Sequence, residues 1–160
     1  MASTANKESC DYFVSLHMNS STNKSAKECE VWVYDEKSKL YILSKSICSN
    51  LSKTINTPNR GVKISKDFSV LRKTKMSALL IEIDFISHSD VEASCKSSKY
   101  IKDIAGSISS TLLSFVNKSI ADDGVFYRVC IGTFKDKSNT VKLKNEAISK
   151  CFKDTYIVTN

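Results

Sequence analysis

The order of apolar and polar positions along the chain predicts strands and helices in turn. Residues 12–17 and 29–34 are short apolar runs rich in β-branched and aromatic side chains, which predicts two strands. A longer apolar run at 78–86 predicts an interior strand, and 68–71 is a candidate for a short one. Two other stretches repeat apolar residues at spacings of three and four, the pattern of an amphipathic helix. The stripes are Leu40, Leu43, Ile47, Leu51 and Ile55, and then Ile101, Ile104, Ile108, Leu112 and Phe115.

The C-terminal part of the chain predicts a small unit of its own. Residues 117–124 have the composition of a linker, and after them come a predicted strand (126–131), a helix (139–151) and a strand (155–158). Alternating strands and helices are typical of an α/β domain with a largely parallel sheet. We therefore expect such a domain over residues 1–118 and a compact βαβ unit over residues 125–160.

Composition excludes several classes of protein. The 160 residues, 41% of them hydrophobic, suffice for one domain with a real core. No stretch approaches the roughly 18 consecutive apolar residues of a membrane span, and the N-terminus lacks the apolar core of a signal peptide. The six cysteines form no C-x-x-C pair, so we expect neither a zinc ribbon nor a dense disulfide framework, and mostly reduced, packed thiols.

Net charge bears on the partner. The chain carries +7, which favours a polyanionic partner without identifying it. One stretch, 60–75, is rich in cations and could be either a solvated basic surface or a groove that faces an anionic polymer. Its cations are Arg60, Lys63, Lys66, Arg72, Lys73 and Lys75, against the single Asp67. Aromatic residues are not interleaved with these cations as single-stranded nucleic acid would require, so nucleic acid is not the expected partner.

Two polar residues stand where an apolar strand should not carry them. His17 ends the first predicted strand, and Glu82 lies inside "LLIEIDF". A buried carboxylate is costly unless it is paired, protonated or bound to a metal. Functional groups of open α/β sheets gather at the carboxyl ends of strands, where both residues are expected. Taken singly, His17 could also be a hydrogen-bonded core histidine, and Glu82 could belong to an edge strand.

The segments around these residues resemble a known family. "CDYFVSLHMNSS" resembles the "ADLFVSIHANA" segment of zinc-dependent N-acetylmuramoyl-L-alanine amidases. "NRGVKISKDFSVLRKTKMSALLIEIDFISHSDVEA" resembles their "RGVK…F.VLR.T..PA.L.E.GF.SN..E" segment, and the likeness covers roughly residues 2–116 in the same order. It implies a three-layer amidase domain with a mostly parallel sheet flanked by helices. It also implies that His17 ligates zinc, that Glu82 is the catalytic acid/base, and that the substrate is the amide bond between N-acetylmuramic acid and L-alanine in peptidoglycan.

The chemistry is consistent with these roles. A zinc ion with three protein ligands and one open position polarises a carbonyl and activates water. A carboxylate beside that water can carry its proton to the leaving amine, and a mainly apolar strand should raise the pKa of Glu82 as such a shuttle requires.

The chain departs from the family pattern in its ligand set. Members carry two further zinc ligands, a histidine and a glutamate, upstream of the matching segment, so we expect an N-terminally truncated amidase with one of three ligands. His88 aligns with a loop position where the family usually has asparagine, and Glu8 falls on the helix before the first strand. Neither is expected to replace the missing ligands. The alternative function is a non-catalytic peptidoglycan-binding remnant.

The C-terminal unit has a resemblance of its own. "FYRVCIGTFKDKSNTVKLKNEAISKCFKDTYIV" resembles one half of a SPOR-type repeat, which implies binding to peptidoglycan glycan strands; a generic βαβ appendage is the other interpretation. Because a complete repeat has two halves, a homodimer joined through these tails is possible. Lysins of this kind can lack a signal peptide, so we expect a route to the cell wall through lysis or a separate pore.

Overall fold

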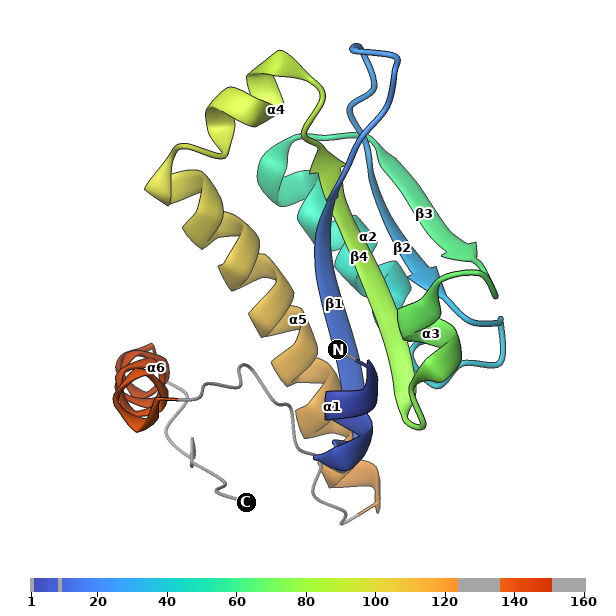
Figure 1. The fold of residues 1–160 in the computed structure, drawn as a ribbon, viewed down its shortest axis with the longest axis vertical. Coiled ribbons are helices and arrows are strands. Elements are labelled where there is room, and N and C mark those ends of the chain that lie inside the picture. The colour runs from blue at the N-terminus through green and yellow to red at the C-terminus, as the bar shows by residue number, and fades with distance from the viewer. Residues whose placement is uncertain (1, 9, 124–135, 151–160) are drawn as a thin grey trace. The chain divides into compact units, whose positions relative to one another are not determined.

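A four-stranded sheet with helices on both faces organises the larger part of the chain (Figure 1). The computed structural model describes residues 2–8, 10–123 and 136–150, and the chain divides into two compact units, residues 1–129 and 130–160, which are described separately. The elements are α1 (Ala2–Lys7), β1 (Tyr12–Asn19), β2 (Cys29–Val33), α2 (Tyr41–Ile55), β3 (Asn59–Ile64), α3 (Ser69–Lys73), β4 (Ser77–Phe85), α4 (Ser89–Ser94), α5 (Ser98–Asp123) and α6 (Lys137–Ser149).

The strands are ordered β1-β4-β2-β3, and the sheet is mixed. β1 runs parallel to β4 and β2 parallel to β3, but β2 runs antiparallel to β4. The predicted interior strand is confirmed as β4, whereas the sheet is less uniformly parallel than the alternation of elements suggested. Because β2 is reversed, its first residues lie beside the carboxyl ends of β1 and β4. This placement brings together the polar groups described below.

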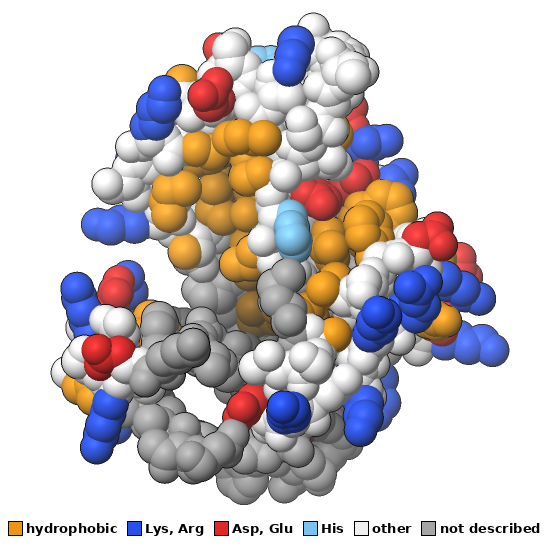
Figure 2. Space-filling view, in the orientation of Figure 1, with side chains coloured by type: hydrophobic (Ala, Val, Ile, Leu, Met, Phe, Trp, Pro, Cys, Tyr) orange, Lys and Arg blue, Asp and Glu red, His pale blue; other side chains and the backbone are white. Residues whose placement is uncertain are grey.

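One face of the sheet carries α3 at the end where β4 begins. Trp32 and Phe68 meet there edge to face, with ring centroids 5.2 Å apart. The buried members of this cluster are Leu71, Ala78 and Leu80. Figure 2 views the molecule from this side, on which apolar side chains remain at the surface beside polar ones.

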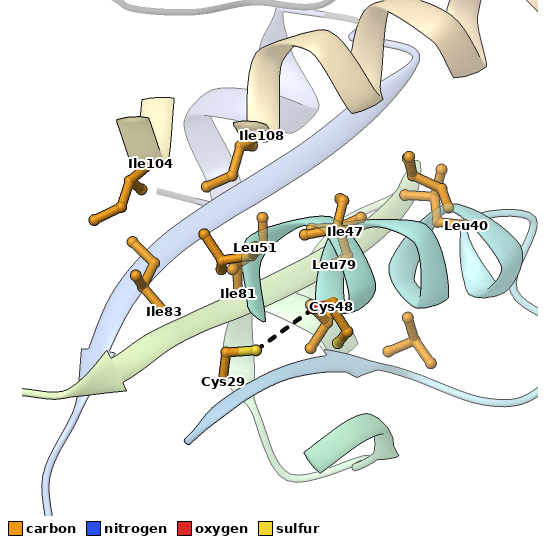
Figure 3. Packing of buried hydrophobic residues seen from close by; sticks show 13 residues of the cluster. Cys29, Leu40, Ile47, Cys48, Leu51, Leu79, Ile81, Ile83, Ile104 and Ile108 are labelled. Atoms are coloured by element: carbon orange, nitrogen blue, oxygen red, sulfur yellow. Dashed lines mark hydrogen bonds between the residues drawn. The ribbon is translucent and has the colours of Figure 1, made fainter. Parts of the chain in front are cut away.

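The other face is covered by α2 and α5 and holds the main core (Figure 3). Both predicted stripes supply this core, except that Ile101 at the start of the second is 49% exposed. Cys29 and Cys48 are packed inside it, and the Cys29 thiol donates a hydrogen bond to the Cys48 carbonyl oxygen at 3.6 Å. These two cysteines are therefore the reduced, packed thiols that were expected. The residues buried in this core are Cys29, Val31, Val33, Leu40, Leu43, Ile47, Cys48, Leu51, Leu79, Ile81, Ile83, Ile104 and Ile108.

Two predicted elements are corrected, and one strand was not predicted. Residues 68–71 are not a strand, because Ser69–Lys73 form α3; a four-residue apolar run does not distinguish the two by periodicity. The predicted linker 117–124 is wrong up to residue 123, since α5 continues to Asp123. No strand was predicted over residues 59–64, which form β3; this strand is an edge of the described sheet, where Gly61 is tolerated.

The predicted C-terminal helix is confirmed as α6, within two residues at each end. The strands predicted at 126–131 and 155–158 lie outside the described residues, and so do the βαβ unit and the tail-mediated homodimer that depend on them. Within the described ranges, no helix combines the length and apolar character needed to cross a lipid bilayer.

Candidate active site

His17, Glu82 and Glu30 form a row across three neighbouring strands. In the register of the sheet, Glu82 of β4 is opposite His17 of β1 on one side and opposite Glu30 of β2 on the other. Residues directly opposite on neighbouring strands share a face, with strand axes about 4.8 Å apart. The row lies near the carboxyl ends of β1 and β4. On the face shown in Figure 2, a histidine side chain lies next to acidic side chains.

Glu30 is the most tightly held member of the row. It is 3% exposed, and its Oε1 accepts hydrogen bonds from Trp32 Nε1 at 3.0 Å and from Asn19 Nδ2 at 3.1 Å. Arg60 Nη1 lies 3.3 Å from Glu30 Oε2, which is an ion-pair distance without an aligned hydrogen bond. The same guanidinium contacts Glu28 Oε2 through Nε at 2.6 Å. These partners offset the cost of burying the Glu30 charge.

Glu82 has a different environment. It is partly buried, and its Oε2 has no hydrogen-bond partner within the described residues. Burial and, as the smaller cause, the neighbouring Glu30 charge together raise the pKa of the Glu82 carboxyl to about 6. The raised pKa expected from the apolar strand is confirmed. Glu82 therefore exchanges a proton close to neutral pH.

His17 is held by its own strand. Its Nε2 and the hydroxyl oxygen of Ser15, two residues earlier on the same face, share a hydrogen bond of 2.8 Å. Ser15 is buried, so the imidazole is fixed in orientation beside Glu82. This contact is what a hydrogen-bonded histidine would make, and it also fixes the ring as a ligand histidine requires.

The described residues do not form a complete zinc site. No group of three or more His, Cys, Asp or Glu side chains among them is placed to hold a metal ion. His88 Nδ1 instead accepts a hydrogen bond from the Asp90 amide at 3.2 Å and caps α4. Glu8 directly follows α1, and its amide donates to the Thr4 carbonyl oxygen at 3.1 Å.

Sequence reasoning missed Glu30. The signal was available, because a carboxylate inside the apolar run "CEVWVY" is as unexpected as Glu82 inside its own strand. Its position opposite Glu82 depends on the reversed direction of β2, which only the structure shows.

Comparisons with known proteins agree with this fold. The sequence profile of a family described as N-acetylmuramoyl-L-alanine amidase matches residues 1–114. The N-acetylmuramoyl-L-alanine amidase CwlM of Bacillus licheniformis is 30% identical over 149 residues, which are 92% of this chain and 57% of that protein. The sporulation-specific N-acetylmuramoyl-L-alanine amidase of Bacillus subtilis (strain 168) matches to the same extent. The chain thus spans little more than half the length of these relatives.

Solved structures give the same result. The N-acetylmuramoyl-L-alanine amidase of Clostridium difficile 630 superposes with a TM-score of 0.67 at 29% identity, over 72% of this chain and 63% of that one. The catalytic domain of the CD27L endolysin targeting Clostridia difficile gives a TM-score of 0.59 at 30% identity, over 71% of this chain and 59% of that one.

Proposed function

The chain belongs to the N-acetylmuramoyl-L-alanine amidase family, and from this premise we propose that it acts in the hydrolysis of the amide bond between N-acetylmuramic acid and L-alanine in peptidoglycan. The observation that carries the proposal is the row of His17, Glu82 and Glu30. An amidase needs a group that takes a proton from the attacking water and returns it to the leaving amine. Glu82, whose Oε2 has no partner in the described part of the chain, is the candidate for this group.

Each member of the row has a separate role in this proposal. Glu82 is the catalytic acid/base, and its raised pKa lets it hold a proton near neutral pH. Glu30 is a positioning residue, because its buried charge faces Glu82 and is itself fixed by Trp32 and Asn19. His17 is one zinc ligand, as the family resemblance implies. Of the three ligands that the resemblance implies, His17 is the one assigned among the described residues.

The test is Glu82→Gln in a version of the protein with the remaining zinc ligands restored, assayed by the release of new L-alanine amino termini from purified peptidoglycan. The amide keeps the shape of the side chain but cannot carry a proton, so we expect turnover to fall by about 10²-fold or more. Glu92→Gln, the same change at an exposed position of α4, is the matched control and should retain activity. Activity of Glu82→Gln within about tenfold of the unmodified chain would exclude the acid/base role.

A second candidate is a peptidoglycan-binding protein without catalysis. The incomplete metal-ligand set of the described residues favours it. Co-sedimentation with purified peptidoglycan, combined with no amine release in the presence of added zinc, would support this function over the first.

The proposed role of the C-terminal unit is to hold the protein at the cell wall. We propose that residues 125–160 bind glycan strands of the cell wall, and that the protein reaches the wall through lysis or a separate pore. The match to the curated amidases extends into part of this region, because it covers 149 residues of the chain. A version ending at Asp123, the last residue of α5, should co-sediment with peptidoglycan less than the full chain, and equal co-sedimentation would exclude the role.

A further inference from the structure

A basic cavity lies on the first unit, away from the row of His17, Glu82 and Glu30. It is shallow and open to solvent, with a volume of about 510 Å³, and it is formed by the loop after β2, by the end of α3 and by the turn that leads into β4. Ala78 in its wall precedes Glu82 by four residues of β4, so the two positions are about 13 Å apart along the strand. The cavity is therefore separate from the candidate active site. The residues lining it are Tyr34, Asp35, Lys37, Ser38, Lys39, Leu71, Arg72, Thr74, Lys75, Met76, Ser77 and Ala78.

Positive charge dominates the lining. Four cations, Lys37, Lys39, Arg72 and Lys75, face one carboxylate, that of Asp35. Asp35 Oδ1 accepts a hydrogen bond from the Lys37 backbone amide at 2.9 Å, so this carboxylate is engaged by its own turn. The ion pairs recorded for the described residues include none of the four cations. In Figure 2, Lys and Arg side chains gather over α3 and the adjoining loops.

The two ends of the basic stretch at 60–75 differ in whether carboxylates neutralise their charges. At its start, Arg60 is neutralised by Glu28 and Glu30. Towards its end, Arg72 and Lys75 line the cavity without a carboxylate partner among the described ion pairs. Of the two interpretations of this stretch, the charge distribution thus favours an anion-binding groove at its C-terminal end, completed by lysines of a loop distant in sequence.

We propose that this cavity is a binding site for an anionic cell-wall polymer, a chain whose repeat units carry phosphate or carboxylate groups. The expectation that such a polymer is within reach rests on the proposed function. A single carboxylate would leave most of the cations unneutralised, whereas a polymer with repeated charges can engage several at once. The planar guanidinium of Arg72 suits a two-point contact with an oxyanion, and the lysines add point charges around it.

Nucleic acid is the less suitable polyanion. Binding of single strands relies on several aromatic rings that stack on successive bases. Tyr34 is the one aromatic residue lining the cavity, and Lys66 Nζ already lies 5.8 Å from the centroid of its ring. The Tyr34 ring therefore contacts the Lys66 ammonium group through a cation–π interaction. The lining residues form no stacking platform for bases.

The test measures the affinity of the full chain for poly(glycerol phosphate) by isothermal titration calorimetry. This probe has no amide bond, so the result does not depend on whether the chain hydrolyses peptidoglycan. Arg72→Gln combined with Lys75→Gln should weaken binding at least tenfold. The matched control is Lys53→Gln combined with Lys102→Gln, which removes the same charge from exposed positions of α2 and α5 and should weaken binding less than twofold.

Three results would overturn the proposal. Equal losses in the two double variants would show that binding depends on net charge and not on the cavity. Tighter binding of an oligo(dT) of equal charge would assign the cavity to nucleic acid. In NMR titrations of the unmodified chain, the polymer should shift backbone amides of residues 34–39 and 71–77, and shifts confined to other residues would place the binding elsewhere.

Discussion

Replacement of Glu82 by glutamine should make folding more favourable at neutral pH and have no such effect in acid. The pKa of Glu82 lies at about 6 in the folded chain instead of the ordinary 4.5, because burial and the Glu30 charge disfavour its ionised form. At 1.36 kcal/mol for each pH unit, this difference sets an upper limit of about 2 kcal/mol on the destabilisation once the group is ionised, because solvent screens this partly buried carboxylate. Glutamine cannot ionise, so the variant lacks this destabilisation.

The direction of this pH dependence follows from the number of protons that the folded and unfolded chains bind. Between pH 4.5 and about 6, the folded chain holds more protons on Glu82 than the unfolded chain does. The free energy of unfolding therefore falls as the pH rises through this window, and the full cost is present above it. The stability of Glu82→Gln relative to the unmodified chain should increase by at most about 2 kcal/mol between pH 4 and pH 7.5.

Urea denaturation of both proteins at pH 4 and pH 7.5 measures this change, because titrations of all other groups are shared by the two proteins and largely cancel. A relative stability that stays constant within about 0.5 kcal/mol between the two pH values would refute the reasoning. Carbon-13 NMR of the Glu82 carboxyl gives the pKa directly. In Glu30→Gln, we expect that pKa to fall but to remain above 4.5, since burial is the larger cause. An unchanged value would show that the Glu30 charge does not act on Glu82.

Two further predictions concern the core. Leu51→Ala, at a fully buried position of α2, should lower the free energy of unfolding by about 2–5 kcal/mol in urea denaturation. Ile42 is 66% exposed on the same helix, so Ile42→Ala should change the free energy of unfolding by about 0.5 kcal/mol or less. Equal losses in the two variants would contradict the assigned packing. Burial raises the pKa of Cys29 to about 11 and that of Cys48 to about 12, so iodoacetamide at pH 8 should leave both thiols unmodified in the folded chain and alkylate them in urea. Peptide mass spectrometry distinguishes the two states, and comparable modification without urea would be inconsistent with the fold.

The strongly periodic elements could be predicted from the sequence, and the short ones could not. The stripe on α2 and the nine-residue β4 carry enough apolar positions to fix both type and burial. α3 has five residues, and its conformation is decided by how Phe68 and Leu71 pack on the sheet. The C-terminus of α2 is set by Asn56 in the left-handed conformation, with φ of 51°, directly before the segment that becomes β3.

Two of the three residues of the candidate site could be predicted from the sequence, and the third could not. A polar residue inside an apolar strand is visible in the sequence, and this identified His17 and Glu82. Which strands lie side by side, and in which direction, is a tertiary property. Glu30 is separated from Glu82 by more than 50 residues of the chain, and it reaches its place only because β2 runs antiparallel to β4.

The separation between the row and the basic cavity has an electrostatic consequence. A cation about 13 Å from Glu82, the distance along β4 to the cavity wall, interacts with its carboxylate by about 0.3 kcal/mol through water. That energy corresponds to about 0.2 of a pH unit in the pKa. The distance also exceeds the Debye length of about 10 Å at 0.1 M salt, so the effect in buffer is smaller still. Neutralising Arg72 and Lys75 should therefore leave the pKa of Glu82 at about 6. It follows that loss of polymer binding and loss of proton transfer are separable by mutation, and that a variant losing both would have been altered in its fold and not in its charge.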